Sequence, residues 1–182
     1  MKKFQVDDTL IAISPLPEAE LTETKPQPHA RERATVKALL ERLGLPSQVD
    51  HHPDGSPFLP GFDGYISISH SRESVAIALN PHHRIGIDTE TWRPQLKRVK
   101  HKFLSTRELE VYQGNPGLLL AWCMKEAAYK AAGIKGLELI GGIHLPDTLN
   151  ETEILILPAG FKLKTTTIEL TATSATILCT PI

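Results

Sequence analysis

The sequence predicts an α+β fold made of two similar lobes, residues 1–82 and 83–182, with a site between them. Three observations lead to this prediction. The first is a repeated order of elements, since each half shows a strand, then a helix, then antiparallel strands. The second is length, because 182 residues suffice for one large domain or for two small lobes that share a core. The third is composition: 41% hydrophobic and 23% charged residues are ordinary values for a soluble globular protein.

The first half begins with a strand expected over residues 9–13. A helix is expected between Pro28, which suits a helix start, and Gly44, which suits the position just after a helix end. Two paired strands over 65–69 and 75–79 then flank a polar turn. The expected helix has a continuous apolar stripe made by Val36, Leu39, Leu40 and Leu43.

The second half begins with a strand over 84–90, followed by a basic helix over 96–112. Another helix is expected over 117–132. Its predicted boundaries rest on an N-cap, a first-turn proline and a terminal glycine: Asn115, Pro116 and Gly133. Alternating or clustered apolar residues predict three final strands, over 153–157, 161–169 and 171–179.

Charge and hydropathy narrow the classes of function. A net charge of −1 argues against bulk attraction to nucleic acid or to an anionic membrane, so any basic site must be local. No stretch approaches 18 apolar residues, and the polar segment 5–8 interrupts any signal-peptide core. We therefore expect a cytoplasmic protein that binds neither nucleic acid nor membrane. Cys123 and Cys179 have neither disulfide-framework nor zinc-ligand spacing.

The expected helix over 117–132 carries charges on an almost wholly apolar surface. Such a helix is normally buried, yet it contains Lys125, Glu126 and Lys130. Buried charges need partners or a metal ion, because desolvating them alone is costly. The alternative is a Glu126–Lys130 surface pair at i, i+4 on a helix with one solvated edge.

Two carboxylates share one face of the strand over 84–90. Alternation places Gly86, Asp88 and Glu90 together. Hard oxygen ligands of this kind suit magnesium, which commonly takes one or two carboxylates plus phosphate oxygens of a substrate. Glycine at 86 would let a backbone or a ligand approach closely. The alternative is a strand end whose acids face water.

Four ordered segments together resemble the 4'-phosphopantetheinyl transferases. The strand Gly86-Ile87-Asp88-Thr89-Glu90 resembles the family pattern Gly-(Ile or Val)-Asp-x-Glu, and Trp122 to Lys130 resembles Trp-x-x-Lys-Glu-(Ala or Ser)-x-x-Lys. Between them, Phe103-Leu104-Ser105-Thr106-Arg107-Glu108 looks like Phe-(Phe or Leu)-Ser-x-x-Glu. Ile68-Ser69-His70-Ser71 is similar to the Asn-Ile-Ser-His-Ser motif of the larger, single-chain type that activates surfactin synthetase, with Ser67 in place of asparagine. The resemblance runs from about Asp54 to Gly136.

The resemblance implies a pseudo-dimer of two similar α+β halves with the active site at their interface. It implies that a magnesium ion is held by Asp88, Glu90 and Glu126. It further implies that coenzyme A is held by Lys130 and Ser69, with Arg33 and His70 at its 3'-phosphate end. Arg33 borders the apolar stripe by helical angle, so it is able to point inward.

The implied activity is that of a holo-acyl-carrier-protein synthase type transferase. A serine of an apo acyl or peptidyl carrier protein attacks coenzyme A, and adenosine 3',5'-bisphosphate leaves. Phosphoryl transfer asks mainly for positioning and charge neutralisation, which Lys130 and the magnesium ion would supply. Either Glu126 or Glu108 is a candidate to accept the serine proton.

Two departures from the family pattern favour an alternative, a non-catalytic coenzyme A or nucleotide-binding module. The family's Gly-Lys-Pro stretch reads Gly55-Ser56-Pro57 here, which removes a lysine from the nucleotide end. The connection before the first helix is acidic, with Glu18, Glu20 and Glu23. Retention of the three carboxylates and Lys130 favours the active enzyme.

A run of positive charge without acids extends from Trp92 to Phe103. One interpretation is a solvated helix face. The other is a docking surface for an acidic carrier protein, because complementary charge steers encounter. The basic residues of the run are Arg93, Lys97, Arg98, Lys100 and Lys102.

Overall fold

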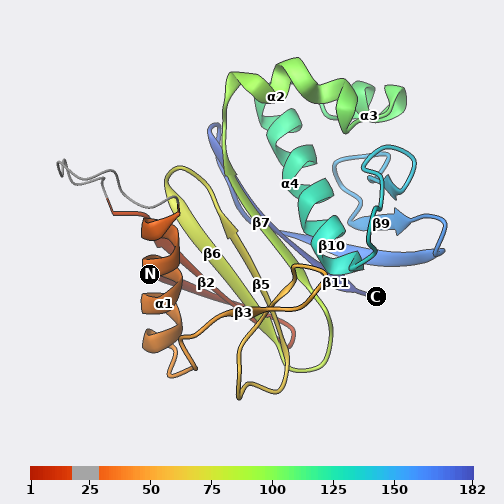
Figure 1. Ribbon diagram of the computed structural model, residues 1–182. Helices are drawn as coiled ribbons and strands as arrows, with labels where there is room; N and C mark the ends of the chain where they lie inside the picture. The colour runs from red at the N-terminus through yellow and green to blue at the C-terminus, as the bar shows by residue number, and fades with distance from the viewer. Residues whose placement is uncertain (18–28) are drawn as a thin grey trace.

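The computed structural model describes residues 1–17 and 29–182, which form two antiparallel sheets, each packed against a helix (Figure 1). The first sheet has the order β1-β2-β6-β5. Its strands are β1 (Lys2–Val6), β2 (Thr9–Pro15), β5 (Tyr65–His70) and β6 (Ser74–Asn80). A separate two-stranded ladder joins β3 (Asp50–His51) to β4 (Pro57–Phe58). Sheets with segregated helices agree with the predicted α+β class.

The second sheet has the order β7-β11-β10-β9-β8. Its strands are β7 (Gly86–Thr91), β8 (Ile143–His144), β9 (Glu153–Ile156), β10 (Phe161–Leu170) and β11 (Ser174–Pro181). All neighbouring strands are antiparallel. β7 therefore lies at one edge of this sheet, with β11 on one side and the first sheet close to its other side.

Helix α1 (Ala30–Arg42) covers one face of the first sheet (Figure 1). Three residues of the predicted stripe are buried in a cluster with Ala12, Val75 and Ile77 of the sheet, and the fourth, Leu43, is partly buried against it. Gly44 has a φ of 71°, the left-handed conformation expected just after a helix end, so this predicted stop is confirmed. The predicted start at Pro28 and the acidic residues Glu18, Glu20 and Glu23 lie outside the described residues.

Helix α4 (Gly114–Ala132) crosses the second sheet over β7 and β11 (Figure 1). Its N-cap is Gln113 rather than Asn115, so the helix begins earlier than the sequence predicted. The predicted end is confirmed, since Gly133 has a φ of 62° and forms the left-handed cap. Its buried face includes Cys123, which packs as a small apolar residue, as Cys179 does on β11.

The prediction of one basic helix over 96–112 is wrong. The structure has α2 (Pro94–Val99), a 3₁₀ turn η1 (Lys100–Lys102) and α3 (Thr106–Val111). The interruption has a local cause: Ser105 and Glu108 form a capping box that starts a new helix. Strand β1 was also missed. It pairs with β2 through a tight turn in which Asp7 has a φ of 48°.

A shared apolar cluster joins the two sheets. Ile11 and Ala76 belong to the first sheet, and Ile87 and Leu178 belong to the second. Strand β7 therefore has two packed faces, one against the first sheet and one against α4. Among the helices of the described residues, none has the length and apolar character needed to cross a membrane.

Candidate active site

Gly86 brings β7 into direct backbone contact with α4. A Cβ atom added at this position would lie 1.9 Å from the Ala127 carbonyl oxygen and 2.7 Å from the Ala131 nitrogen. No side chain fits there without moving the helix. The expectation that Gly86 permits a close approach is thus confirmed, and the approaching element is the backbone of α4. The contact places the acids of β7 beside the charged residues of α4.

Asp88 and Lys130 form an ion pair across this contact. Lys130 Nζ lies 2.8 Å from Asp88 Oδ1 and donates a second hydrogen bond to the Ile87 carbonyl oxygen at 2.9 Å. Asp88 is buried, and 29% of the Lys130 side chain is exposed. Lys130 is therefore paired with a carboxylate of the neighbouring strand, in contrast to the alternative surface pair with Glu126.

Glu90 and Glu126 complete an acidic cluster with Asp88. Burial raises the pKa of Glu126, and the nearby charges of Asp88 and Glu90 raise it further, while Lys130 acts in the opposite direction. Burial likewise raises the pKa of Glu90 and Asp88 adds to this, although the Thr91 amide and Arg93 lower it. Arg93 Nη2 lies 2.8 Å from Glu90 Oε2. The three carboxylates thus interact electrostatically.

The donor set of this cluster fits a hard divalent cation. The three carboxylates come from β7 and α4, and part of the rise in the pKa of Glu126 comes from the negative charges of Asp88 and Glu90, which a cation would offset. The counter-charges present in the structure are Lys130 and Arg93. The oxygens of Asp88, Glu90 and Glu126 are not all within 4.8 Å of one another. Among the described residues, His29, Glu32 and His70 meet that condition.

Two serine hydroxyls of β5 satisfy the free edge of β7. Ser67 Oγ accepts from the Ile87 amide at 3.0 Å, and Ser69 Oγ accepts from the Thr89 amide at 3.2 Å. Ser69 Oγ also donates to Asp88 Oδ1 at 2.8 Å. The serines replace the ladder bonds of a neighbouring strand and attach the first sheet to the acidic cluster.

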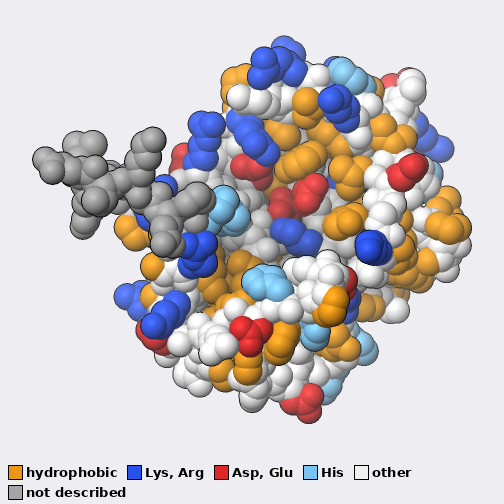
Figure 2. Space-filling model, in the orientation of Figure 1, with side chains coloured by type: hydrophobic (Ala, Val, Ile, Leu, Met, Phe, Trp, Pro, Cys, Tyr) orange, Lys and Arg blue, Asp and Glu red, His pale blue; other side chains and the backbone are white. Residues whose placement is uncertain are grey.

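A cleft of about 680 Å³ extends from Lys130 between α1, β5 and the end of α4. Figure 2 shows acidic and basic side chains meeting in the hollow at the centre of this face. The basic residues that line the cleft outnumber the two acidic ones, Glu32 and Asp54. The cleft is therefore locally basic in a chain of net charge −1. The cations are Arg33, Lys37, Arg84, Lys130 and Lys135.

The structure brings most of the predicted binding residues to this cleft. Arg33 and His70 both line it, from α1 and β5, together with Lys130. Ser69 was predicted to bind coenzyme A, but the described lining does not include it. Its side chain is turned to Asp88 and Thr89 instead, and only 6% of the residue is exposed.

The Gly55-Ser56-Pro57 segment also lines the cleft. The Ser56 amide and hydroxyl both donate to Asp54 Oδ1, at 2.9 and 2.6 Å. These hydrogen bonds, with the Arg84 guanidinium 3.5 Å from the other oxygen, lower the pKa of Asp54 to about 2. Ser56 therefore stabilises its own turn, at the position where the family pattern has a cationic lysine.

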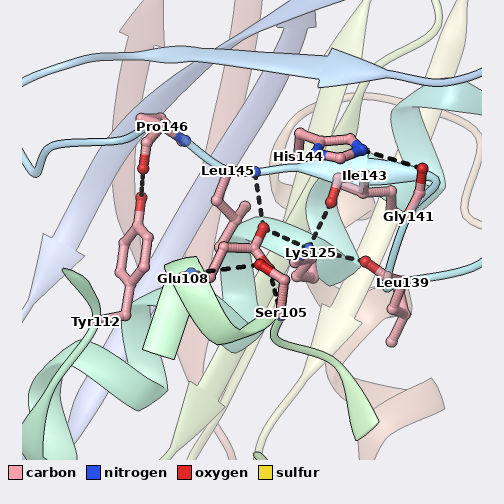
Figure 3. Close-up of polar contacts among 10 residues, drawn as sticks. All are labelled: Ser105, Glu108, Tyr112, Lys125, Leu139, Gly141, Ile143, His144, Leu145 and Pro146. Carbon is pink, nitrogen blue, oxygen red and sulfur yellow. Dashed lines mark hydrogen bonds and ion pairs between the residues drawn. The ribbon is translucent and has the colours of Figure 1, made fainter. Parts of the chain in front are cut away.

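Glu108 lies in a second buried cluster (Figure 3). Its Oε1 accepts from Lys125 Nζ at 2.7 Å and from the Leu145 amide at 3.0 Å, and its Oε2 accepts from the Ser105 amide at 2.8 Å. Lys125 is fully buried and also donates to the carbonyl oxygens of Leu139 and Ile143. Within the described part of the chain, these contacts connect Glu108 to the core under α4 and not to Asp88 or Glu126.

Sequence reasoning missed several charged residues of the site. Arg84 precedes the acidic strand and lines the cleft, where its Nε also donates to the Lys130 carbonyl oxygen at 3.2 Å. Lys135 follows the end of α4 and lines the same cleft. Both flank the recognised motifs, so their position next to those motifs was the available signal. Arg93 was assigned only to the basic run, although it pairs with Glu90.

One family model matches part of the chain. Residues 84–171 match the family model described as the 4'-phosphopantetheinyl transferase superfamily. The matched segment contains the acidic cluster and Lys130, whereas Arg33 and His70 lie before it. A comparison with curated proteins gave no match.

Proposed function

We propose that this protein transfers the 4'-phosphopantetheine arm of coenzyme A to a serine of an apo acyl or peptidyl carrier protein, as holo-acyl-carrier-protein synthases do. The observation that carries the proposal is the Asp88–Lys130 ion pair, flanked by Glu90 and Glu126, at one end of a basic cleft. The superfamily match over residues 84–171 supports the same activity in general terms.

The cleft suits a ligand with several phosphates. Its volume of about 680 Å³ is within the usual range for small-molecule sites, and its cations favour an anionic ligand. Lys130 lines the cleft and pairs with Asp88 of the acidic cluster, and we assign the pyrophosphate of coenzyme A to it. Arg33 and His70 line the part of the cleft formed by α1 and β5, and we assign the 3'-phosphate to them.

The reaction is a displacement at phosphorus. The carrier serine oxygen forms a bond to the β-phosphorus, the pyrophosphate P–O bond breaks, and adenosine 3',5'-bisphosphate leaves with the electron pair. Lys130 holds a fixed positive charge beside the phosphates. A magnesium ion held by Asp88, Glu90 and Glu126 would supply further neutralisation of the pyrophosphate charge.

Glu126 is the better candidate to accept the serine proton. Its side chain is partly exposed, and it interacts electrostatically with Asp88 and Glu90 in the acidic cluster. Glu108 already accepts hydrogen bonds at both oxygens from Lys125, Leu145 and Ser105. We assign Glu108 to positioning α3 against α4 rather than to proton transfer.

We also propose the pseudo-dimer of the larger, single-chain type, with lobes 1–82 and 83–182. Each part has one antiparallel sheet and one long helix. All strands of the first sheet precede the connection at 81–85 in the sequence, and all strands of the second sheet follow it. The proposed site needs both parts, since His70 and Arg33 come from the first and Asp88 and Lys130 from the second.

A second candidate function is a non-catalytic coenzyme A-binding module. The observation that favours it is Ser56, whose hydroxyl is bonded to Asp54 and supplies no positive charge to the cleft. The two functions are separated by incubating the protein with coenzyme A, magnesium and a panel of apo carrier proteins. A mass gain of one phosphopantetheine on the carrier serine supports the transferase. Coenzyme A binding without any mass gain across the panel supports the module.

A further inference from the structure

His29, Glu32 and His70 converge at one side of the cleft. One ligand atom from each, an imidazole nitrogen or a carboxylate oxygen, lies within 4.8 Å of the other two. His29 and Glu32 belong to the start of α1, and His70 ends β5. The trio is therefore assembled by the fold from segments far apart in the sequence. It lies outside residues 84–171, which match the superfamily.

One distance within the trio is close to the ligand spacing of a tetrahedral metal site. Two ligands at about 2.1 Å from a zinc ion at the tetrahedral angle are about 3.4 Å apart. His29 Nδ1 and Glu32 Oε1 are 3.7 Å apart. The rings of His29 and His70 meet edge to face, with centroids 5.3 Å apart and an interplanar angle of 66°.

We propose that His29, Glu32 and His70 form a binding site for a divalent transition metal of the zinc class. Two imidazoles and one carboxylate are a ligand set that zinc takes, with a fourth position left open. Imidazole favours zinc, copper, iron and nickel over magnesium, so this site is chemically distinct from the all-carboxylate cluster at Asp88. All three residues line the cleft, so a ligand in the cleft is able to reach the metal.

The charge state of Glu32 agrees with metal binding. A hydrogen bond from its own backbone amide lowers the pKa of Glu32, and the neighbouring His70 and His29 lower it further. Glu32 is therefore a carboxylate at neutral pH.

One consequence rests on the proposed function. His70 is assigned there to the 3'-phosphate of coenzyme A, so a metal ion on His70 would alter coenzyme A binding. Coenzyme A titrations with and without stoichiometric zinc test this consequence. Zinc binding that leaves coenzyme A affinity unchanged would contradict the 3'-phosphate role of His70, and it would not affect the metal site itself.

The metal site is tested by isothermal titration of zinc chloride into the tag-free, chelator-treated protein without coenzyme A. We expect one site, with affinity lowered at least tenfold in His29→Asn, Glu32→Gln and His70→Asn, since even the outer partners of metal ligands contribute about 10- to 100-fold. Asparagine is chosen at 29 because it tolerates the left-handed backbone, where His29 has a φ of 59°. Circular dichroism confirms that each variant is folded.

The matched control removes two other exposed histidines, His82 and His83, whose rings lie 6.1 Å apart on a loop outside the trio. The His82→Ala/His83→Ala variant should bind zinc as the wild type does. Absence of stoichiometric zinc binding by the wild type would overturn the proposal. Equal affinity in the trio variants, or loss of binding in the control alone, would overturn it as well.

Discussion

The Ala127 carbonyl oxygen occupies the space in which a side chain at Gly86 would begin, since a Cβ there would lie 1.9 Å from it. This contact sets the distance between β7 and α4. It therefore also sets the distance between Asp88 on the strand and Lys130 on the helix, which form an ion pair at 2.8 Å. The site depends on a glycine that takes no part in the chemistry.

Replacing Gly86 by alanine should lower both stability and activity. Overpacking a tight contact typically costs about 1–3 kcal/mol, and the clash here is with backbone atoms that cannot rotate away. Urea denaturation measures the stability loss. Gly136→Ala is the control, because open space surrounds Gly136 and only its φ of 76° opposes a side chain. A Gly86 variant as stable as the wild type would contradict the role of this contact.

Arg33→Ala and His70→Ala should weaken coenzyme A binding more than they reduce turnover at saturation. Both residues line the cleft, from α1 and β5, and we assign the 3'-phosphate to them. The decisive comparison uses 3'-dephospho-coenzyme A. The variants should lose affinity for coenzyme A but little for the dephospho form. Arg42→Ala, at the exposed end of the same helix, is the control. Equal losses for both ligands would show that the 3'-phosphate assignment is wrong.

Reversing Lys97 and Lys100 to glutamate should raise the KM for the carrier protein and leave that for coenzyme A nearly unchanged. Within α2, Leu96 is buried and the neighbouring Lys97 is exposed. The effect should fade with added salt, because the screening length falls to about 3 Å near 1 M. The control is the Lys3→Glu/Lys162→Glu variant, which makes the same change of charge on β1 and β10. Equal effects on both substrates would mean that the basic run contacts coenzyme A.

The Glu108–Lys125 pair should contribute stability that depends on pH (Figure 3). Burial raises the pKa of Glu108, but hydrogen bonds from Lys125, Leu145 and Ser105 outweigh this and hold it below its usual 4.5. A lowered carboxyl pKa stabilises the fold above the unfolded value and loses that effect as pH falls through the folded value. Glu108→Gln should therefore cost about 3–5 kcal/mol at pH 7.

Urea denaturation of wild type and Glu108→Gln at pH 7 and at successively lower pH below about 4.5 checks this expectation. The difference in stability should shrink as Glu108 becomes protonated in the wild type. The Glu108→Gln/Lys125→Met double variant should recover part of the loss, because it leaves no unpaired buried charge. A difference that stays constant with pH would contradict a charged Glu108.

The sequence predicted the elements that carry strong local signals. Gly44 and Gly133 marked helix ends correctly because a left-handed cap has a local requirement for glycine. The alternation that grouped Gly86, Asp88 and Glu90 depends only on strand geometry. The break between α2 and α3 was missed, although the Ser105–Glu108 spacing of a capping box was present in the sequence.

Long-range pairings could not be predicted from local pattern. Lys130 is at i+4 from Glu126, yet its ion-pair partner is Asp88 on another element. Ser69 was assigned to coenzyme A by resemblance, whereas tertiary packing turns its hydroxyl to Asp88. The convergence of His29, Glu32 and His70 likewise depends on how α1 lies against β5, which no spacing in the sequence reports.

The central claim is that the acidic cluster between β7 and α4 carries out phosphopantetheine transfer. The most direct test follows the mass of an apo carrier protein with coenzyme A and magnesium, using wild type and the near-isosteric variants Glu126→Gln and Asp88→Asn. The account predicts a phosphopantetheine gain on the carrier serine with wild type. It predicts a rate at least about a hundredfold lower in either variant, in line with the loss of one preorganised charge contact, while thermal unfolding shows an intact fold. Transfer at the wild-type rate by either folded variant would contradict it.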